Sequence, residues 1–551
     1  MDENRQHQTK PTVSALGKLT RGKRAYAVLV LCATTAMSLP AQTLTTLYSF
    51  LDSFGSRPPD DPSGLIQATG GNLYGTTFNG GANGSGTVFR ITPSGMLTTL
   101  YSFCPLSGCL DGGGPYAGLV QATNGDLYGT TCCYGPHGAG TAGTIFKITP
   151  SGTLTTLHSF CSDYPSCTDG ADPYAGLVQA ANGDLYGTAY NGGANGYGAV
   201  FKITPSGTLT TLYSFCSQTN CTDGAGPEAG LVQAANGDLY GTTYSGGTSS
   251  AGTIFKITPS GTLTTLHSFN GEDAGGPVAG LVQAANGDLY GTTQGGGTNG
   301  GGTIFKITPS GTVTTLYSFC PQTPCRDGGA PDAGLVQAAN GDLYGTTYGG
   351  GTNGHGTVFK ITQGGTLTTL YSFCSQTNCT DGETPFAGLV QAADGDLYGT
   401  TIDGANGNGT IFKITPGGTL TTLYSFCSQT NCRDGGQPNA GLVQDTNGDL
   451  YGTTDYGGGA ASGTVFRLSV GLGPFVKPRP PYGKVGAAIK ILGTNLTGAT
   501  SVSFNGTAAV FTVVSPSLIT TTLPAGASSG KVQVVTPGGT LSSNASFLVV
   551  P

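Results

Sequence analysis

Six pairs of cysteines, each five or six residues apart, are the first candidates for chemistry in this sequence: Cys104/Cys109, Cys161/Cys167, Cys216/Cys221, Cys320/Cys325, Cys374/Cys379 and Cys427/Cys432. Two neighbouring thiols either form a disulfide or bind zinc, and zinc needs four ligands. Each pair supplies only two, and the four histidines after residue 41 are too few to complete six sites. We therefore predict six local disulfides and an oxidising compartment. Cys132 and Cys133 are adjacent, so they bond either to each other or elsewhere.

Two further sets of residues vary where the surrounding sequence is nearly constant. The first set precedes the motif AGLVQ and comprises Tyr116, Tyr174, Glu228, Val278, Asp332, Phe386 and Asn439. The second set follows the motif LYGTT and comprises Phe78, Tyr134, Tyr190, Tyr244, Tyr348 and Tyr456. Aromatic, acidic and amide groups at equivalent positions suit a glycan or a peptide. The alternative is that the aromatic rings only cap the packing between repeats.

Aspartates recur in two places along the sequence. One set lies in tight turns, where a carboxylate accepts hydrogen bonds from local amides: Asp126, Asp184, Asp238, Asp288, Asp342, Asp396 and Asp449. The other set stands beside glycine after the paired cysteines: Asp111, Asp169, Asp223, Asp327, Asp381 and Asp434. Calcium requires six or more converging oxygens. We predict no metal or cofactor, with calcium at the second set as the open alternative.

Catalysis would require one repeat to depart from the others and bring an acid, a base or a nucleophile together. The residues that occur once are Glu228, Glu272, Asp273, Asp332, His137, His355 and Asp403, and they are scattered over different repeats without a motif. We therefore expect a non-catalytic protein. A polysaccharide hydrolase or lyase is the alternative.

The elements that carry these residues belong to a repeat of LTTLYSF, AGLVQAANGDLYGTT and GTIFKITPSG. Its first heptapeptide begins at Leu44, Leu97, Leu154, Leu209, Leu263, Val313, Leu367 and Leu420, with spacings of 53, 57, 55, 54, 50, 54 and 53 residues. Each copy contains four short strand-like runs, in the third copy at 175–180, 184–188, 199–204 and 208–215. Four antiparallel strands repeated radially describe a β-propeller, with a β-solenoid as the alternative.

The ends of the repeat region predict a closed ring of eight blades. The last copy has only three strands and stops at Leu468, whereas residues 44–50 form a strand without a blade of their own. We expect this first strand to pair with residues 463–468, because closure satisfies backbone groups that two open sheet edges would leave unpaired.

Residues 1–41 have the pattern of a signal peptide. Six basic residues precede the apolar run 25–39, and small residues surround Ala41. Removing this segment shifts the net charge from −7 to −11, since six basic and two acidic residues are lost. An acidic protein without basic clusters suits neither nucleic acid nor an anionic membrane. We expect a secreted or cell-surface monomer that does not insert into a membrane; a lipid anchor at Cys32 is the alternative.

The sequence changes in kind after residue 474. GTNL at Gly493–Leu496, VSFNG at Val502–Gly506 and VVTPGG at Val534–Gly539 resemble IPT/TIG domains, which implies an immunoglobulin-like β-sandwich over 474–551. GDLYGTT at Gly237–Thr243 and GTIFKITPSG at Gly252–Gly261 resemble the GloVer repeat of bacterial exported proteins. That resemblance covers 44–468, within a predicted propeller of 42–470, and implies no established chemistry.

Propeller geometry separates the loops onto two faces. The Asn-Gly-Asp and Pro-Ser-Gly turns share one face, which we call the short-turn face, and we expect them to be purely structural. The loops between second and third strands, and those between one repeat and the next, share the other, which we call the long-loop face. Because these vary, we predict an extracellular glycan or surface-protein site there, carried by Tyr116, Tyr174, Glu228, Asp332, Phe386, Asn439, Tyr190, Tyr244 and Tyr348.

Overall fold

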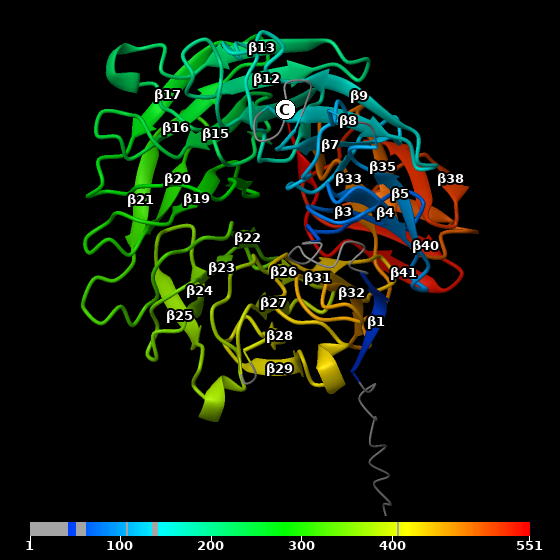
Figure 1. Cartoon of the computed structure of the whole chain (residues 1–551). Helices are drawn as coiled ribbons and strands as arrows, with labels where there is room; N and C mark the ends of the chain where they lie inside the picture. Colours follow the sequence, from blue (N-terminus) through cyan, green and yellow to red (C-terminus); the bar gives the residue numbers. More distant parts are fainter. Residues whose placement is uncertain (1–41, 51–61, 106–107, 135–141, 405–406, 551) are drawn as a thin grey trace, which may run out of the picture. The chain divides into compact units, whose positions relative to one another are not determined.

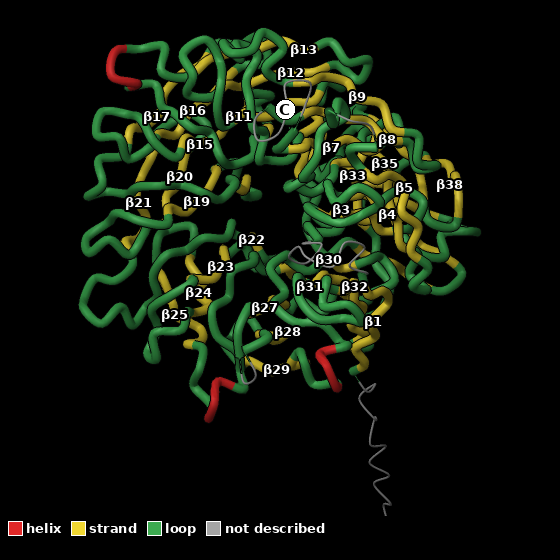
Figure 2. The backbone as a smooth tube through the Cα atoms, in the orientation of Figure 1, coloured by secondary structure: helices red, strands yellow, loops and turns green. Residues whose placement is uncertain are grey.

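The computed structural model describes residues 42–50, 62–105, 108–134, 142–404 and 407–550, and these are almost entirely β-strand and turn. Three short 3₁₀-helices occur among them, η1 (Thr219–Cys221), η2 (Thr377–Cys379) and η3 (Thr430–Cys432), each after the fourth strand of a sheet (Figure 2). In this part of the chain no helix is long and apolar enough to cross a membrane. The predicted signal peptide, 1–41, lies outside the described residues.

Eight four-stranded antiparallel sheets account for the repeats, and the ribbon places each one beside the next along the chain (Figure 1). The first four sheets are β2 (Ile66–Gln67), β3 (Leu73–Thr77), β4 (Thr87–Ile91), β5 (Leu97–Ser102); β6 (Val120–Gln121), β7 (Leu127–Thr131), β8 (Thr144–Ile148), β9 (Leu154–Ser159); β10 (Val178–Gln179), β11 (Leu185–Ala189), β12 (Ala199–Ile203), β13 (Leu209–Ser214); and β14 (Val232–Gln233), β15 (Leu239–Thr243), β16 (Thr253–Ile257), β17 (Leu263–Ser268).

The remaining four sheets repeat the pattern, except that the last takes its fourth strand from the start of the described chain. They are β18 (Val282–Gln283), β19 (Leu289–Thr293), β20 (Thr303–Ile307), β21 (Val313–Ser318); β22 (Val336–Gln337), β23 (Leu343–Thr347), β24 (Thr357–Ile361), β25 (Leu367–Ser372); β26 (Val390–Gln391), β27 (Leu397–Thr401), β28 (Thr410–Ile414), β29 (Leu420–Ser425); and β30 (Val443–Gln444), β31 (Leu450–Thr454), β32 (Thr464–Ser469), β1 (Thr43–Ser49).

The second strand of every sheet is buried along its whole length, which explains the glycine in LYGTT. Gly129 pairs across the sheet with Phe146, whose ring would lie 2.5 Å from a Cβ atom added at Gly129. The same arrangement recurs in all eight sheets, with the phenylalanine ring filling the volume above the glycine. This pair places one large apolar side chain between neighbouring sheets, where most of the core lies.

Three contacts connect the two ends of the repeat region: strand pairing within the eighth sheet, and two kinds of contact that join each sheet to the next. Strand β1 pairs antiparallel with β32 from Thr43↔Ser469 to Ser49↔Thr464, as the sequence predicted. A buried cluster that includes Phe50, Phe89 and Tyr451 connects the last sheet to the first, as equivalent clusters connect the other neighbours.

The third contact is a belt of glutamines from the motif LVQ. Each side-chain oxygen accepts a hydrogen bond from a backbone N–H of the preceding repeat, in the pairs Gln121–Thr69, Gln179–Thr123, Gln233–Ala181, Gln283–Ala235, Gln337–Ala285, Gln391–Ala339 and Gln444–Ala393. Gln67 of the first repeat accepts the equivalent bond from Thr446 of the eighth, at 3.3 Å. The belt therefore has no interruption between the last repeat and the first.

The first strand of each sheet is shorter than the sequence predicted. In the third repeat it spans Val178–Gln179 rather than 175–180, because flanking groups bond to the neighbouring repeat instead of continuing the ladder. The Ala175 carbonyl accepts a hydrogen bond from Thr130 Oγ1 at 3.2 Å. Contacts between repeats thus take the place of contacts within the sheet.

The C-terminal segment forms a separate β-structure around its own core. Its strands are β33 (Lys477–Arg479), β34 (Tyr482–Gly483), β35 (Ala488–Leu492), β36 (Ser501–Phe504), β37 (Thr507–Ala508), β38 (Phe511–Ser515), β39 (Leu518–Thr522), β40 (Val532–Thr536), β41 (Gly539–Ser542) and β42 (Leu548–Val549). Two four-stranded sheets, β33-β35-β39-β38 and β37-β36-β40-β41, share a buried cluster that includes Ile491, Phe504 and Phe547. This arrangement is immunoglobulin-like.

Candidate functional site

The C-terminal segment contacts the short-turn face of the repeats. Its side chains bond to residues at the end of the first strand or in the turn that follows it, in the pairs Ser517–Thr69 (3.1 Å), Lys490–Thr123 (2.6 Å), Tyr482–Gln233 (3.3 Å), Asn544–Gln391 (3.2 Å) and Lys477–Gln444 (3.0 Å). Five of the eight repeats take part. The expectation that these turns are purely structural was therefore incomplete, since they also hold the C-terminal domain.

On the long-loop face, four aromatic side chains from the first three repeats lie in contact, and we call them the aromatic row. Their ring centroids are separated by 6.1 Å from Phe78 to Tyr116, 6.2 Å from Tyr116 to Tyr174, and 5.6 Å from Tyr174 to Tyr190. All three pairs are edge-to-face, a favoured geometry for aromatic rings. Tyr116 is 63% exposed and Tyr174 is 36% exposed, so the row presents ring surface to solvent.

The row combines both sets of variable positions that the sequence singled out. Tyr116 and Tyr174 belong to the first set, whereas Phe78 and Tyr190 belong to the second. A second combination occurs further along the chain, where Tyr348 and Phe386 lie 6.4 Å apart, again edge-to-face. Tyr244 is 40% exposed and lies over Gly276 of the following repeat.

Hydrogen bonds correct the second set at two positions. Tyr190 N donates a hydrogen bond to Asp172 O, and Tyr244 N donates one to Gly226 O. In the second and eighth repeats the equivalent donors are the N–H groups of Cys132 and Asp455, not those of the predicted tyrosines. Tyr134 and Tyr456 lie two residues and one residue further along. The sequence interpretation missed this because an insertion in the second repeat and a neighbouring tyrosine in the eighth obscured the alignment.

Acidic residues lie beside and beyond the aromatic row. Glu228 is half-buried, and burial raises the pKa of its carboxyl. It lies near Tyr174, whose pKa is raised by burial and then by the charges of Asp172, Tyr190, Glu228 and Tyr116. Burial also raises the pKa of Asp332, which a hydrogen bond from Gln294 partly offsets.

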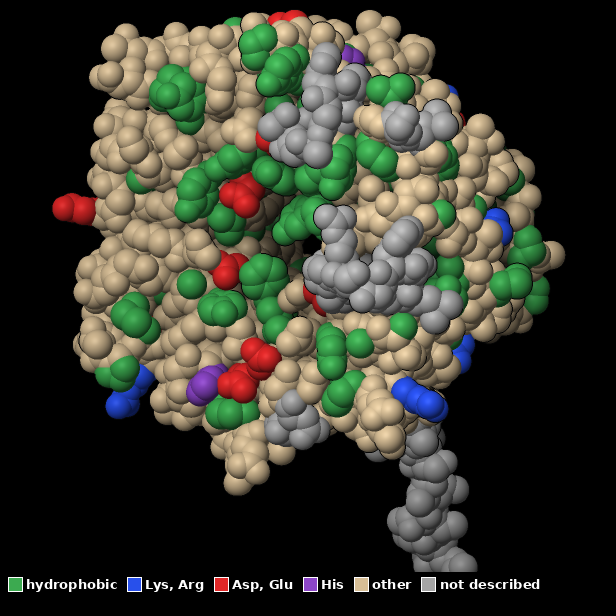
Figure 3. Space-filling model, viewed as in Figure 1, with side chains coloured by type: hydrophobic (Ala, Val, Ile, Leu, Met, Phe, Trp, Pro, Cys, Tyr) green, Lys and Arg blue, Asp and Glu red, His purple; other side chains and the backbone are tan. Residues whose placement is uncertain are grey.

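The other predicted positions are more peripheral or already paired. Asn439 Nδ2 donates to Asp455 Oδ2, so this amide is held by a neighbouring carboxylate. Val278 is an apolar residue of the first variable set and lies between Glu228 and Asp332 in the sequence. Figure 3 shows hydrophobic and acidic side chains around a hollow in the middle of the visible face. Lysine and arginine lie towards the outer edge of that face.

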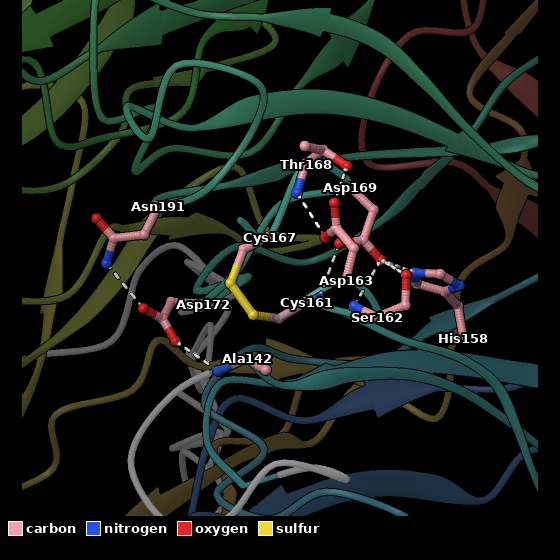
Figure 4. The surroundings of a disulfide bond; sticks show 10 residues. All are labelled: Ala142, His158, Cys161, Ser162, Asp163, Cys167, Thr168, Asp169, Asp172 and Asn191. Atoms are coloured by element: carbon pink, nitrogen blue, oxygen red, sulfur yellow. Dashed lines mark hydrogen bonds and ion pairs between the residues drawn. A yellow bond between two sulfur atoms is a disulfide. The ribbon is translucent and has the colours of Figure 1, made fainter. Parts of the chain in front are cut away.

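The six predicted cysteine pairs are disulfide-bonded in the structure. The bonds are Cys104–Cys109, Cys161–Cys167, Cys216–Cys221, Cys320–Cys325, Cys374–Cys379 and Cys427–Cys432. Each bond closes a loop that follows the fourth strand of a sheet, as Figure 4 shows for Cys161 and Cys167. Because both sulfurs of every pair are bonded, none of these cysteines supplies a thiolate to zinc.

The backbone around the second cysteine differs between the loops, which the nearly uniform spacing did not predict. In three loops this cysteine ends a 3₁₀-helix: Cys221 in η1, Cys379 in η2 and Cys432 in η3. Cys109, Cys167 and Cys325 instead lie outside any helix or strand, although the carbonyl oxygen of the second cysteine accepts a hydrogen bond from a glycine N in all six loops, as from Gly112 at 2.9 Å and from Gly170 at 3.0 Å. The prediction at Cys109, Cys167 and Cys325 is therefore confirmed for the disulfide, whereas their loops do not share the helical turn of the other three.

The adjacent cysteines Cys132 and Cys133 bond to each other. This vicinal pair lies against the aromatic row, because Cys132 N donates to Gly114 O at 3.1 Å and the Phe78 ring lies over Gly114. Of the two alternatives left open by the sequence, the structure contains the vicinal bond.

The aspartates after the cysteine pairs are engaged in structural hydrogen bonds. Asp169 Oδ2 lies 2.8 Å from His158 Nε2, while Asp169 Oδ1 accepts from Cys161 N at 2.8 Å (Figure 4). In the loop after the third sheet, Asp223 accepts hydrogen bonds from Tyr213 Oη at 2.8 Å and from Ser217 N at 2.9 Å. The carboxylate therefore fastens the disulfide loop to the fourth strand.

The turn aspartates have the same structural character, since Asp126 Oδ2 accepts a hydrogen bond from Asn124 Nδ2 at 3.2 Å. Asn124 Oδ1 accepts from Asp126 N at 3.1 Å, and Asn124 Nδ2 donates to Tyr128 Oη at 2.9 Å. The turn thus covers the hydroxyl of a buried tyrosine in the second strand.

One group of potential metal ligands exists in the described part of the chain: His355, Cys374 and Glu383. His355 Nδ1 lies 2.5 Å from Glu383 Oε2, but the Cys374 sulfur is bonded to Cys379. Two ligands that already pair with each other do not make a metal site. A hollow of about 510 Å³ beside the Cys320–Cys325 loop is lined by glycine, threonine, asparagine and apolar residues, and it includes none of the residues predicted to bind a ligand.

Comparisons with known proteins identify both parts of the chain. The model of the Gloeobacter/Verrucomicrobia repeat matches residues 35–229, 142–337, 217–401 and 321–477, and the model of the IPT/TIG domain matches residues 477–549. No curated protein matches the chain.

Solved structures with a similar fold are distant in sequence. A periplasmic gluconolactonase from Pseudomonas aeruginosa is 16% identical over 66% of this chain and 95% of its own, with a TM-score of 0.40. A lectin from Burkholderia pseudomallei is 11% identical over 67% of this chain and 96% of its own, with a TM-score of 0.40. A fungal alcohol oxidase of the AA5 family, in complex with copper, is 11% identical over 92% and 99%, with a TM-score of 0.42. Matches at this level decide nothing about function.

Proposed function

The chain belongs to the Gloeobacter/Verrucomicrobia repeat family, and we propose that its eight repeat sheets are the blades of a closed β-propeller. Three observations support closure: β1 pairs with β32, a buried cluster joins the last sheet to the first, and Gln67 bonds to Thr446. A ring satisfies the edges that an open stack would leave unpaired.

The propeller acts as a non-catalytic recognition or adhesion module that binds extracellular carbohydrate on its long-loop face. The observation that carries this proposal is the aromatic row, since flat exposed rings stack on the apolar faces of sugars. The C-terminal domain strengthens the choice of face, because its hydrogen bonds engage the short-turn face at five repeats. None of these five bonds involves a described residue of the long-loop face.

The disulfides of the chain support the proposal that it is exported. Seven disulfides in the described residues fit an oxidising compartment. We place the protein outside the cytoplasm, as a secreted or surface-associated monomer delivered by the signal peptide of residues 1–41. It needs no metal for binding.

A glycan array tests this function. The full chain should bind a subset of glycans, and the double variant Tyr116→Ala/Tyr174→Ala should lose about tenfold or more in affinity, because two ring contacts that contribute about 0.7 kcal/mol each together change Kd tenfold. Tyr197→Ala is the matched control, since Tyr197 is also an exposed tyrosine, 51% accessible, on a loop between second and third strands. Binding to a surface protein but to no glycan would favour the protein alternative.

A polysaccharide hydrolase or lyase is the second candidate, favoured by the raised pKa values of Glu228 and Asp332. Glycosidases pair one protonated carboxyl with one carboxylate. These two residues stand in the fourth and sixth repeats, with Val278 of the fifth between them in sequence. Product release from a polysaccharide that Glu228→Gln or Asp332→Asn abolishes would establish the enzyme and overturn the non-catalytic function.

A further inference from the structure

The long-loop face combines aromatic rings with acidic groups, and we propose that its ligand is a cationic polysaccharide built from amino sugars with free amines. This inference rests on the carbohydrate-binding function proposed above and specifies its substrate class. It is carried by the composition of the site, by the distribution of basic residues over the repeats, and by one buried carboxylate oxygen.

The aromatic half of the site suits a positive charge. Tyr174 contacts Tyr116 and Tyr190 and lies within electrostatic reach of Glu228 and Asp172. The faces of tyrosine rings attract cations, and the attraction increases when water is excluded. A ring cluster that binds a neutral sugar by stacking alone has no need of a carboxylate beside it. Here an ammonium group would contact rings and carboxylate together.

The acidic half of the site includes a carboxylate oxygen without a partner. Asp332 Oδ1 is buried and accepts no hydrogen bond from the described residues, while Gln294 bonds to the carboxyl group. Leaving a buried carboxylate oxygen unpaired is costly, and a ligand that reaches it without supplying a donor does not relieve that cost. An ammonium group supplies a charge-assisted donor, whereas an acetamide N–H supplies only a neutral one.

No basic side chain of the described repeats occupies a variable position of this site. In the described repeat residues every lysine and arginine stands either in a third strand or next to the second cysteine of a disulfide loop: Arg90, Lys147, Lys202, Lys256, Lys306, Arg326, Lys360, Lys413, Arg433 and Arg467. Several of the strand residues pair with turn aspartates, as Lys413 does with Asp396 at 2.8 Å. None occupies the positions of Tyr116 to Asn439 that precede the first strands. The variable positions are therefore acidic without a cation among them, which disfavours anionic polysaccharides.

The distinguishing experiment compares three oligosaccharides of equal length by calorimetry with the full chain: β-1,4-linked glucosamine, its N-acetylated form, and a uronate. We expect the amine form to bind about tenfold more tightly than the acetylated form, as one charge-assisted hydrogen bond contributes. The difference should shrink as salt is added, because the charges are only half-buried. The uronate should bind least.

Variants separate charge from stacking. Glu228→Gln and Asp332→Asn should each weaken binding of the amine form about three- to tenfold and weaken the acetylated form by less, while circular dichroism should show that each variant is folded. Tyr116→Ala should weaken both forms. Equal affinity for the amine and acetylated forms would overturn the cationic ligand but preserve carbohydrate recognition. Failure of both forms together with every array glycan would overturn the proposed function itself.

Discussion

The substitution Phe50→Ala tests whether the repeats form a ring. Phe50 follows β1 and belongs to the cluster between the last sheet and the first, with its ring 5.5 Å from that of Phe89. Phe103 is its equivalent one repeat later, 5.2 Å from Phe146. The backbone contacts also match, since Phe50 N donates to Gly463 O at 3.1 Å and Phe103 N donates to Gly86 O at 3.0 Å. Phe103→Ala is therefore a matched control.

The size of the effect follows from burial. Phe50 is 6% exposed and Phe103 is fully buried, so each truncation removes a complete aromatic core contact, which costs about 3–5 kcal/mol. Urea unfolding with the disulfides intact should give similar losses for both variants. In an open stack Phe50 would face solvent at the terminal sheet, where truncation costs less than about 1 kcal/mol. A loss that small for Phe50→Ala, beside a full loss for Phe103→Ala, would refute the closed propeller.

Three further substitutions test local features. Gly129→Ala should destabilise by about 1–3 kcal/mol in urea unfolding, because its Cβ would lie 2.5 Å from Phe146 Cζ; a loss below that of the uncrowded control Gly64→Ala would contradict this packing. Asp223→Asn should lower the free energy of unfolding by about 1–3 kcal/mol, because it weakens the hydrogen bonds from Tyr213 and Ser217. It should also make the Cys216–Cys221 loop more susceptible to proteolysis. Unchanged stability would show that the carboxylate is dispensable. Burial lowers the pKa of Lys477 to about 7 from 10.5, so the unfolded chain binds more protons than the folded chain between these pH values. The free energy of unfolding should therefore rise with pH in that range. Lys477→Met should remove that rise, and an unaltered pH profile of the variant would show that Lys477 is not buried in solution.

Most of the fold could be predicted from the sequence because each feature of the repeat recurs in eight copies. Alternation of apolar residues located the second, third and fourth strands to within a residue or two, as in β11 and β12. The surplus strand at residues 44–50 indicated its pairing with the last repeat. The first strands were overestimated, because the alanine that opens AGLVQ reads as a strand residue although its carbonyl bonds to the preceding repeat.

The candidate site was predictable only in part. Positions that precede the first strands were found because they vary against a constant background, and Tyr116 and Tyr174 do lie together. The contact of Tyr174 with Tyr190 joins the two sets, and no local pattern encodes it. Docking of the C-terminal domain escaped prediction for the same reason, since Tyr482 and Gln233 are 249 residues apart.

The repeated polar residues and the variable ones divide the work of the chain between them. Glutamines of the belt bond to the neighbouring repeat, turn asparagines cover buried tyrosines, and loop aspartates fasten the disulfide loops. Residues with such fixed partners hold the fold, which is why they recur. The aromatic row is different, because three successive repeats contribute to it and no repeat contains it whole. A ligand that uses the row and Glu228 together must span several repeats, which favours an extended chain of sugars over a single small molecule.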